Sequence, residues 1–178
     1  MVFKNINKDI VVKKIERKLR KLQRKISKKY SKNKEGRRYI KTSNIIKLEK
    51  RIKKLHRKLK NIRLDYTHKT TTSIVKTKPC KVVMEDLNVT GMMKNKHLSK
   101  AIQQQNLYEF TRQMKYKCEW LGIKFIQVGR FYPSSKTCSR CGHIKKDLKL
   151  SDRTYICSEC GLVIDRDLNA SINLANYR

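Results

Sequence analysis

Four of the six cysteines in the chain fall into two short units with the spacing of metal ligands. The first unit reads Cys138-Ser-Arg-Cys141-Gly and the second reads Cys157-Ser-Glu-Cys160-Gly, with 15 residues between Cys141 and Cys157. This spacing predicts a four-cysteine zinc site. Because four thiolates complete a tetrahedron, we expect a structural zinc ion with no open position for water. A pair of disulfides is the alternative, and a cytoplasmic location disfavours it.

The residues around these units favour a metal as the source of local stability. A glycine follows the second cysteine of each unit, and glycine admits the positive φ with which backbone amides turn toward thiolates. The intervening segment is too short for a core of its own, so metal affinity is expected to supply much of its folding energy. Cys80 and Cys118 have no second cysteine at ligand spacing and are predicted to be ordinary buried thiols.

Two short acidic motifs hold the other side chains that could do chemistry. Glu85 stands at the carboxyl end of an apolar run, the place where α/β folds gather functional groups. Asp165 and Asp167 stand at the start of a predicted C-terminal helix. A purely local explanation competes, because Asp86, Asn88 and Asp165 are residue types that cap helices or form turns. Acids are scarce in this half of a very basic chain, however, and the two motifs flank the same predicted sheet.

Two long helices are predicted within residues 1–70. Apolar residues recur in both at steps of three or four, which is the spacing of a helix with one buried stripe. The stripes comprise Val12, Ile15, Leu19, Leu22 and Ile26 in the first helix, and Ile45, Leu48, Ile52, Leu55, Leu59 and Ile62 in the second. The polar segment SKNKEGRRYIKTSN separates them, so we expect an antiparallel helical hairpin with its apolar stripes facing each other.

Positive charge is concentrated on this hairpin. The chain has 178 residues, 46 of them Lys or Arg and 14 Asp or Glu, which gives a formal net charge of +32. Residues 1–70 hold 27 basic and 5 acidic side chains. Mixed charge would indicate an ordinary solvated face, but here like charges stack and repel. A phosphate backbone would relieve that repulsion, so nucleic acid is the predicted partner, with calmodulin-type or membrane-surface binding as the minor alternative.

No segment predicts a membrane span or a secretion signal. No run approaches the roughly 18 apolar residues that a span requires. The opening segment has neither an apolar stretch of the signal-peptide type nor a small-residue cleavage site. We therefore expect a cytoplasmic protein with no membrane partner.

The rest of the chain alternates strands and helices. Residues 81–84 and 124–128 are short apolar or β-rich runs that predict strands. An apolar stripe over residues 100–121 predicts a helix between them. One face of a short C-terminal helix carries Leu168, Ile172 and Ala175. The order strand, helix, strand, cysteine module, helix predicts an α/β core interrupted by an insert.

Three segments resemble, nearly word for word, the OrfB/TnpB proteins of bacterial and archaeal insertion sequences. They are residues 84–93 (MEDLNVTGMM), 132–142 (YPSSKTCSRCG) and 160–174 (CGLVIDRDLNASINL). The resemblance covers about residues 10–178 and includes the basic hairpin. Members of this family are RNA-guided DNA endonucleases related to the type V CRISPR effectors. The resemblance implies DNA and guide RNA as partners, and a RuvC-like RNase H fold interrupted by a four-cysteine zinc ribbon.

Site roles follow from the resemblance, position by position. Glu85 resembles the second catalytic carboxylate of the family, and Asp167 resembles the third. Asp165 stands two residues early, so it is the backup candidate and is expected to cap the helix or lie outside the site. Phosphodiester cleavage by two metal ions about 4 Å apart needs carboxylates that bind both ions, while waters and phosphate oxygens complete the octahedra. Hard oxygen ligands suit Mg²⁺ or Mn²⁺.

One part of the family pattern has no match. The family's first catalytic Asp lies on the opening strand of the fold, in a segment that reads like Gly-Ile-Asp-Leu-Gly. The only Asp ahead of the hairpin here is Asp9, which looks like the cap of the first helix. The family's larger N-terminal guide-RNA and target-binding regions are unmatched too. We therefore expect the C-terminal portion of such a protein, and we predict that it does not cleave DNA appreciably by itself.

The predicted fold is α/β, an incomplete RNase H/RuvC-like core with a basic antiparallel helical hairpin and an inserted four-cysteine zinc ribbon. The hairpin is assigned to residues 1–70, the core remnant to 71–131 and 162–178, and the ribbon to 132–161. The predicted function is that of a truncated, transposase-associated nucleic-acid-binding protein whose family activity is metal-dependent DNA cleavage, completed by an upstream segment or a transposase partner. A non-catalytic zinc-ribbon module that binds nucleic acid, or a ribonucleoprotein component, is the alternative.

Overall fold

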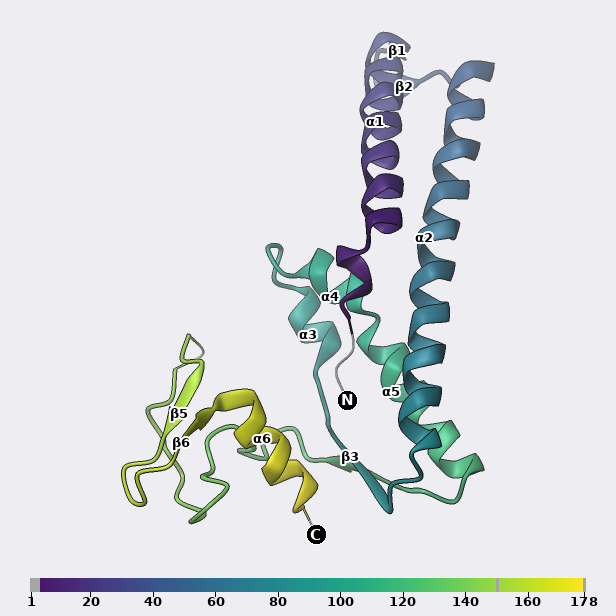
Figure 1. The fold of residues 1–178 in the computed structure, drawn as a ribbon. Helices are drawn as coiled ribbons and strands as arrows, with labels where there is room; N and C mark the ends of the chain where they lie inside the picture. The colour runs from purple at the N-terminus through teal and green to yellow at the C-terminus, as the bar shows by residue number, and fades with distance from the viewer. Residues whose placement is uncertain (1–3, 150, 178) are drawn as a thin grey trace.

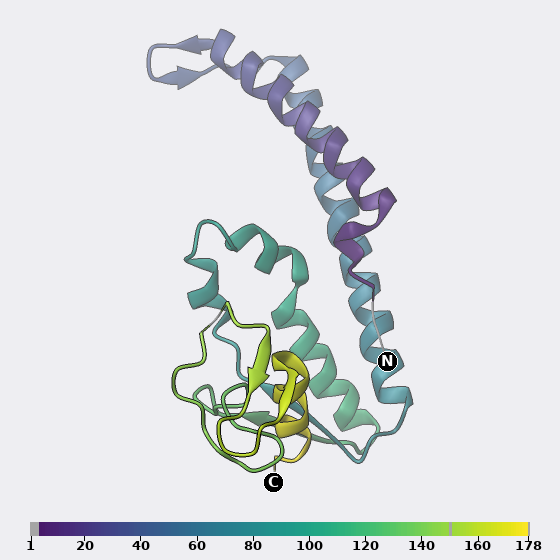
Figure 2. The ribbon, with the colours of Figure 1, turned by 60° about the vertical axis from the view of Figure 1, so that its left-hand side comes forward.

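Two helices form a long arm that stands away from the rest of the molecule (Figure 1, Figure 2). The computed structural model describes residues 4–149 and 151–177. Helix α1 spans Ile10–Lys32 and helix α2 spans Ser43–Lys76, and they run side by side in opposite directions. A short 3-10 helix, Ile6–Lys8, precedes α1. The arm is the helical hairpin that the apolar spacing predicts.

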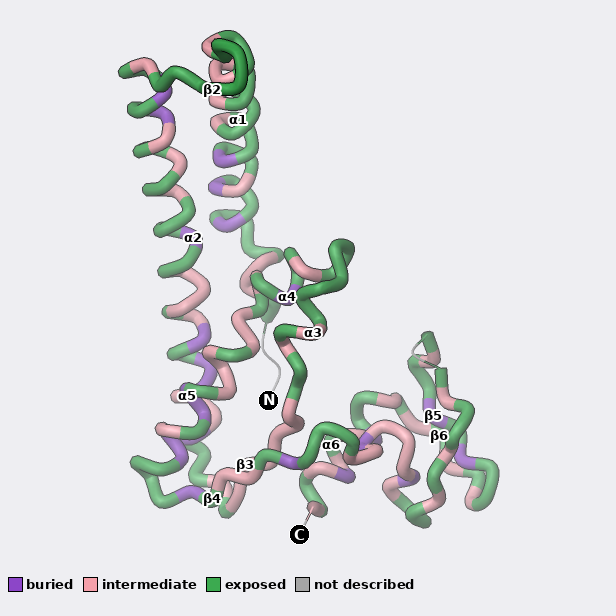
Figure 3. The backbone as a smooth tube through the Cα atoms, turned by 180° about the vertical axis from the view of Figure 1, so that it is seen from behind, coloured by how far each residue is buried: buried purple, intermediate pink, exposed green. Residues whose placement is uncertain are grey.

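Side-chain caps and an apolar seam explain why these residues form the arm. The Asp9 carboxylate accepts hydrogen bonds from the backbone N–H groups of Val11 and Val12, so Asp9 is the N-cap that the sequence predicts. Thr42 caps α2 in the same way through the N–H of Ile45. The seam appears in Figure 3 where buried positions of the two helices face each other. One buried cluster comprises Val12, Ile15, Leu19 and Leu59, and Ile45 and Leu48 of α2 are also buried.

The polar segment between the helices folds into a small hairpin at the tip of the arm. Strand β1 (Lys34–Glu35) pairs antiparallel with strand β2 (Arg38–Tyr39). The aromatic ring at the end of β2 packs edge-on against Tyr30 of α1. Glu49 of α2 accepts a hydrogen bond from the Tyr30 hydroxyl and pairs with Lys41 at 3.0 Å. These contacts join residues 8 to 19 positions apart, which is beyond the reach of a helical or strand period, so no periodic pattern predicts the tip.

Helix α2 continues past residue 70 and packs its lower part against helix α5 (Leu107–Trp120). The buried polar side chains of these two helices include Thr71, Gln113 and Lys117. The Thr71 hydroxyl bonds Gln113 Oε1 at 3.0 Å, and Lys117 Nζ donates to Thr71 Oγ1 at 2.6 Å. Burial lowers the pKa of Lys117. The contact between α2 and α5 is therefore a hydrogen-bonded polar seam within a mostly apolar neighbourhood.

A two-stranded parallel sheet forms the centre of the lower part of the molecule. Strand β3 spans Lys81–Glu85 and strand β4 spans Lys124–Val128, in a register that places Glu85 opposite Val128. The bounds of β4 are those that the sequence predicts, and β3 is one residue longer. Figure 1 shows the sheet below the arm, between the α2–α5 pair and the C-terminal part of the chain.

Helices cover both faces of this sheet. Val82, Met84 and Phe125 pack against the core that α2 and α5 contribute, around Met114 and Cys118. Successive side chains of a strand point to opposite faces, so Val83 and Glu85 face the other way. Helix α6 (Arg166–Ala175) covers this second face, because a groove of about 340 Å³ is lined jointly by β3 residues and by α6 residues.

The helix predicted over residues 100–121 is two helices. Helix α4 spans Ser99–Gln105 and α5 begins at Leu107. Asn106 between them has a left-handed backbone with φ of 57°, which ends the first helix and redirects the chain. A further short helix, α3 (Val89–Met93), follows β3, with Asn88 as its cap. The periodic stripe therefore predicts buried positions such as Ile102, Met114 and Cys118. It is wrong at Leu121, which is 53% exposed, and it does not reveal the break at Asn106.

The cysteine-rich segment and α6 complete the fold. Strand β5 (Thr154–Ile156) pairs antiparallel with strand β6 (Val163–Asp165), beside a small core around Tyr155. The predicted apolar face of α6 is wrong, because Leu168 is 52% exposed. Asn169 and Asn173 are the buried residues of this helix. The reason is physical, since both amides bond backbone groups of the adjoining loop.

Candidate functional site

The four cysteines of the two predicted units come together in the structure. Their sulfur atoms all lie within 4.8 Å of one another. The Sγ atoms of Cys138 and Cys160 are 3.6 Å apart, and so are those of Cys141 and Cys157. A disulfide has an S–S length of about 2.05 Å, so neither pair is covalently bonded. The pair of disulfides is thus excluded in this structure, and the cluster is one that could hold a metal ion.

Tight turns shape each cysteine unit. Gly142 has φ of 78° and Gly161 has φ of 68°, which is backbone that a side chain would strain. The N–H of Gly142 bonds the Cys138 carbonyl at 2.9 Å, and the N–H of Gly161 bonds the Cys157 carbonyl at 3.2 Å. Each unit therefore places its two sulfurs on the same side of a turn, as the CxxCG spacing predicts.

Two thiols of the cluster have pKa values that are shifted in opposite directions. A backbone hydrogen bond from His143 lowers the pKa of Cys141, but burial and hydrogen bonds with the other cysteines outweigh it and raise this pKa to about 12. Backbone hydrogen bonds from Cys160 and, to a smaller extent, from Glu159 lower the pKa of Cys157 to about 6, although burial opposes this. Burial raises the pKa of the adjoining Tyr155 to about 12, and the nearby cysteine thiolates raise it further. Four sulfur donors, one of them readily deprotonated, suit a soft or borderline divalent ion.

The two remaining cysteines differ from each other. Cys118 is fully buried between α5 and the sheet, as predicted, and burial raises the pKa of its thiol. The prediction that Cys80 is buried is wrong, because Cys80 is exposed immediately before β3. Neither thiol belongs to the metal cluster among the described residues.

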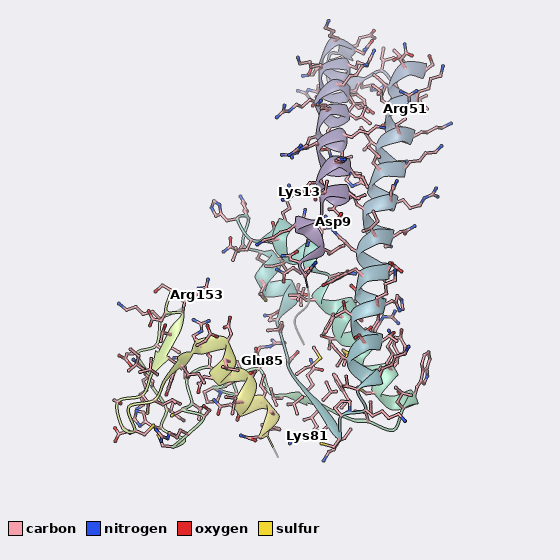
Figure 4. All side chains as sticks on the ribbon, in the orientation of Figure 1. Asp9, Lys13, Arg51, Lys81, Glu85 and Arg153 are labelled. Carbon is pink, nitrogen blue, oxygen red and sulfur yellow. The ribbon has the colours of Figure 1, made fainter. Side chains whose placement is uncertain are left out.

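Glu85 lies at the end of β3, on the face of the sheet that α6 covers. Figure 4 labels it beside α6. One of its carboxylate oxygens, Oε1, accepts a hydrogen bond of 2.5 Å from the Ser134 hydroxyl. The next residue, Asp86, lies outside this contact and pairs with Arg130 at 3.1 Å. Glu85 and Asp86 are neighbours in sequence, but their side chains have different partners.

Asp165 and Asp167 lie where α6 begins. Asp165 is the N-cap, and its Oδ1 accepts hydrogen bonds of 2.9 Å from the backbone N–H groups of Asp167 and Leu168. The expectation that Asp165 caps the helix is confirmed. Asp167 is exposed in the first turn of α6. Within residues 4–149 and 151–177, no three carboxylates lie close enough together to bind one ion.

Basic side chains cover the outer surface of the arm (Figure 4). Figure 4 labels Lys13 of α1 and Arg51 of α2, and most of the exposed positions on these two helices are Lys or Arg. A cleft of about 660 Å³ lies where α1 and α2 meet α4. Its basic lining residues are Arg20, His56, Arg57, Lys60, Arg63 and Lys100. Among the described residues, no helix is both long enough and apolar enough to cross a membrane.

Three polar residues at the centre of the site were not singled out from the sequence. Ser134, Asn169 and Asn173 are all buried, and they join the loop after β4 to α6. The signal that could have found the asparagines is their spacing of four residues, which places both amides on the same face of a helix. Ser134 carries no such signal, because its partner Glu85 lies 49 positions away.

Comparisons with known proteins agree with this combination of a basic arm, a parallel sheet and a four-cysteine cluster. The family model OrfB_IS605, described as a probable transposase, matches residues 4–96. A second family model, described as Cas12f1-like, TNB domain, matches residues 108–174. The chain therefore belongs to the OrfB/TnpB family of transposase-associated proteins.

Individual relatives place the chain within this family more closely. It is 35% identical over 133 residues to a Streptomyces pristinaespiralis protein and 33% identical over 153 residues to an Escherichia coli K12 protein, both named as RNA-guided DNA endonucleases. It is 30% identical over 131 residues to the CRISPR-associated endodeoxyribonuclease Cas12f1 of Sulfoacidibacillus thermotolerans. These matches cover 75%, 77% and 71% of this chain, and 33%, 38% and 30% of the respective relatives. The chain thus spans about a third of the length of these relatives.

Solved structures show the same fold. A Cas12f ternary complex matches with a TM-score of 0.64 at 23% identity, over 92% of this chain and 32% of that one. A Cas12f1 complex with single guide RNA and target DNA matches with a TM-score of 0.57 at 22% identity, over 81% of this chain and 45% of that one. The sequence-based assignment to the OrfB/TnpB family is confirmed, and the mixed helix–strand fold is that of these effectors.

Proposed function

We propose that this chain is the nucleic-acid-binding and nuclease part of an RNA-guided DNA endonuclease, and that it contributes Glu85 and Asp167 to a RuvC-like site. The observation that carries the proposal is the position of Glu85, at the end of a parallel strand and on the face covered by α6. Asp167 lies in the first turn of that same helix. The relatives are named after a DNA endonuclease activity, and these names support the proposal.

The two carboxylates have the donor chemistry that hard divalent ions require. Mg²⁺ or Mn²⁺ bound at Glu85 and Asp167 would supply the Lewis acid for phosphodiester cleavage. Two carboxylates hold two such ions poorly against their strong hydration. We therefore propose that a further acidic ligand comes from an upstream segment of the protein or from a transposase partner. Without it, the 178 residues should not cleave DNA appreciably.

The cysteine cluster and the arm complete the proposed function. We assign a structural zinc ion to Cys138, Cys141, Cys157 and Cys160, because four sulfur donors at mutual distances within 4.8 Å suit tetrahedral zinc. We assign DNA and guide RNA to the basic arm and its cleft, which would bind them through phosphates. The solved Cas12f1 relative is a complex with guide RNA and target DNA, which supports these partners.

Complementation of cleavage tests the proposal. The zinc-loaded chain is mixed with, or fused to, a segment that carries a Gly-Ile-Asp-Leu-Gly strand, and DNA cleavage is measured in Mg²⁺ or Mn²⁺. We expect cleavage only with the added segment, and we expect Glu85→Gln and Asp167→Asn each to abolish it. Glu119→Gln removes an exposed carboxylate on α5 and should leave cleavage unchanged. Cleavage that survives both Glu85→Gln and Asp167→Asn would refute the assignment.

A further inference from the structure

The Glu85 carboxylate is held by the loop that follows β4. Ser134 Oγ donates a hydrogen bond of 2.5 Å to Glu85 Oε1. Ser134 is only 4% exposed, so water cannot readily replace its hydroxyl. A carboxylate oxygen has more than one lone pair, which leaves Oε2 and part of Oε1 free for other partners. The bond therefore fixes the direction of the carboxylate without consuming its binding capacity.

Ser134 is held in turn by helix α6. Asn173 Nδ2 donates to the carbonyl oxygens of Ser134 at 2.8 Å and of Thr137 at 2.7 Å. Asn173 is 8% exposed, and both bonds are therefore shielded from water. Removing this amide would leave the Ser134 carbonyl without its side-chain donor, whereas the Thr137 carbonyl would keep a second donor, Asn169 Nδ2. The position of Ser134 thus depends on α6.

The same helix holds the first cysteine unit. Asn169 is fully buried, and its Nδ2 donates to the Thr137 carbonyl at 2.7 Å. Its Oδ1 accepts from the backbone N–H of Ser139 at 2.9 Å. Thr137 and Ser139 flank Cys138, a member of the metal cluster. A continuous series of short hydrogen bonds therefore connects the cysteine cluster, α6, Ser134 and Glu85.

We propose that Ser134 is a positioning residue for the Glu85 carboxylate, and that Asn169 and Asn173 make this positioning depend on an intact cysteine cluster. The inference rests on the proposed function, in which Glu85 binds a divalent ion. The ribbon is then more than a separately stabilised appendage, because its folded state orients a nuclease ligand. Hydrogen-bonded partners of metal ligands commonly change metal affinity 10- to 100-fold when removed.

Mn²⁺ binding to the zinc-loaded full chain, mixed with the segment that carries the Gly-Ile-Asp-Leu-Gly strand, tests the proposal without requiring cleavage. Free Mn²⁺ is measured by electron paramagnetic resonance, and broadening of the Glu85 side-chain signals in nuclear magnetic resonance locates the bound ion. Ser134→Ala should weaken Mn²⁺ binding at Glu85 about tenfold. Ser134→Thr keeps the hydroxyl and should retain the affinity. Ser135→Ala removes the neighbouring hydroxyl as a matched control and should have no effect.

Two further variants test the connection to the cluster. Asn173→Ala and Cys157→Ser should each weaken Mn²⁺ binding at Glu85 as Ser134→Ala does. Zinc content and the thermal unfolding midpoint are measured for every variant, and Ser134→Ala is expected to keep its zinc. A loss of affinity in a folded, zinc-loaded Ser134→Ala chain then reports on positioning and not on unfolding.

The outcomes separate this inference from the proposed function. If Glu85→Gln leaves Mn²⁺ binding and the Glu85-region broadening unchanged, the proposed function fails and the inference fails with it. If Glu85→Gln weakens binding but a folded Ser134→Ala chain binds normally, Glu85 keeps its role and the positioning role of Ser134 is refuted. If Ser134→Ala weakens binding while Cys157→Ser does not, the dependence on the cysteine cluster is refuted.

Discussion

At the scale of single residues, we expect the four cysteines to stabilise the ribbon through a bound metal ion, a role that an apolar core has in larger domains. The buried hydrophobic cluster of the ribbon consists of Tyr155 and two of the cysteines themselves, Cys138 and Cys157. Little apolar area is available to offset the conformational entropy of ordering this segment. A bound metal ion would therefore supply a large part of the free energy that folds the ribbon.

We predict that Cys157→Ser removes the bound zinc and unfolds the ribbon while the arm stays helical. The physical reason is that the ribbon and the arm have separate buried clusters. Elemental analysis should give about one zinc ion per native chain and far less for the variant, and helical circular dichroism should change little. Cys80→Ser is the matched control, because Cys80 is exposed and lies outside the cluster. Equal zinc content in native and Cys157→Ser chains would contradict the assignment.

The site residues divide according to how local their signals are. The four-cysteine site is predictable because each pair of cysteines is close in sequence and is followed by a glycine. The capping roles of Asp9 and Asp165 are predictable because an N-cap residue bonds backbone groups only two or three positions away. Ser134 and Asn173 are not, since their partners come from other parts of the chain. The prediction that Leu168 is buried was wrong for a related reason. The buried face of α6 contacts a backbone carbonyl, and the Asn169 amide, which can donate a hydrogen bond to it, occupies that face in place of a hydrophobic side chain.

At the scale of elements, the α2–α5 pair is joined by polar groups that extend to the helix surface. Arg112 donates two hydrogen bonds to Glu109, at 2.8 and 2.7 Å, and Gln113 donates a third at 2.8 Å. Hydrogen bonds from Arg112 lower the pKa of Glu109 to about 2, although burial opposes the shift. Gln113 continues the network to Thr71 of α2. Glu109 therefore supports a contact between helices, beyond the local pair on α5.

We predict that Glu109→Gln lowers the free energy of unfolding at pH 7 by about 1 kcal/mol. The folded pKa of Glu109 lies below its ordinary value, so its stabilisation is fully present above that ordinary value, about 4.5. It is lost as the pH falls toward 2. Urea unfolding of native and variant chains should therefore differ at pH 7 and converge near pH 2. Glu119→Gln, at an exposed position of the same helix, is the control. A difference that does not change with pH would contradict this prediction.

Periodicity predicts the helices and strands here better than it predicts their interruptions. Two stripes at steps of three and four predict the arm, and two apolar runs predict β3 and β4. The left-handed turn at Asn106 leaves the apolar spacing almost intact, so the pattern continues across it. The β1–β2 hairpin at the tip was not predicted, because its two strands form in a polar segment that has no regular spacing of apolar residues.

At the scale of the whole molecule, the basic residues and the candidate metal-binding carboxylates lie in different parts of the structure. The arm carries most of the charge, whereas Glu85 and Asp167 belong to the sheet and the helix below it. α2 belongs to both parts, since its upper half lines the arm seam and its lower half packs on α5. Removing residues 1–70 would therefore also remove part of the α2–α5 contact, and point substitutions are the cleaner test.

We predict that Lys→Gln at Lys14, Lys18, Lys21 and Lys25 weakens nucleic-acid binding and flattens its salt dependence. Each lost phosphate contact should reduce the slope of log affinity against log salt by about 0.9 on duplex DNA. Lys→Gln at Lys115, Lys124, Lys146 and Lys149 removes the same charge outside the arm and is the control. Binding is measured by fluorescence anisotropy from 50 to 300 mM salt. Equal slopes in the two quadruple variants would show that the arm is not the main phosphate-binding surface.

Helix α2 also sets a length. Its 34 residues form one uninterrupted helix, and a rise of 1.5 Å per residue makes it about 51 Å long. At about 3.4 Å per base pair, that equals roughly 15 base pairs of duplex, or about one and a half helical turns. A duplex lying along α2 would extend over at most this length, and over less of it where the lower half of α2 packs on α5. The number of residues in this helix therefore sets an upper limit on the length of duplex that the arm could contact.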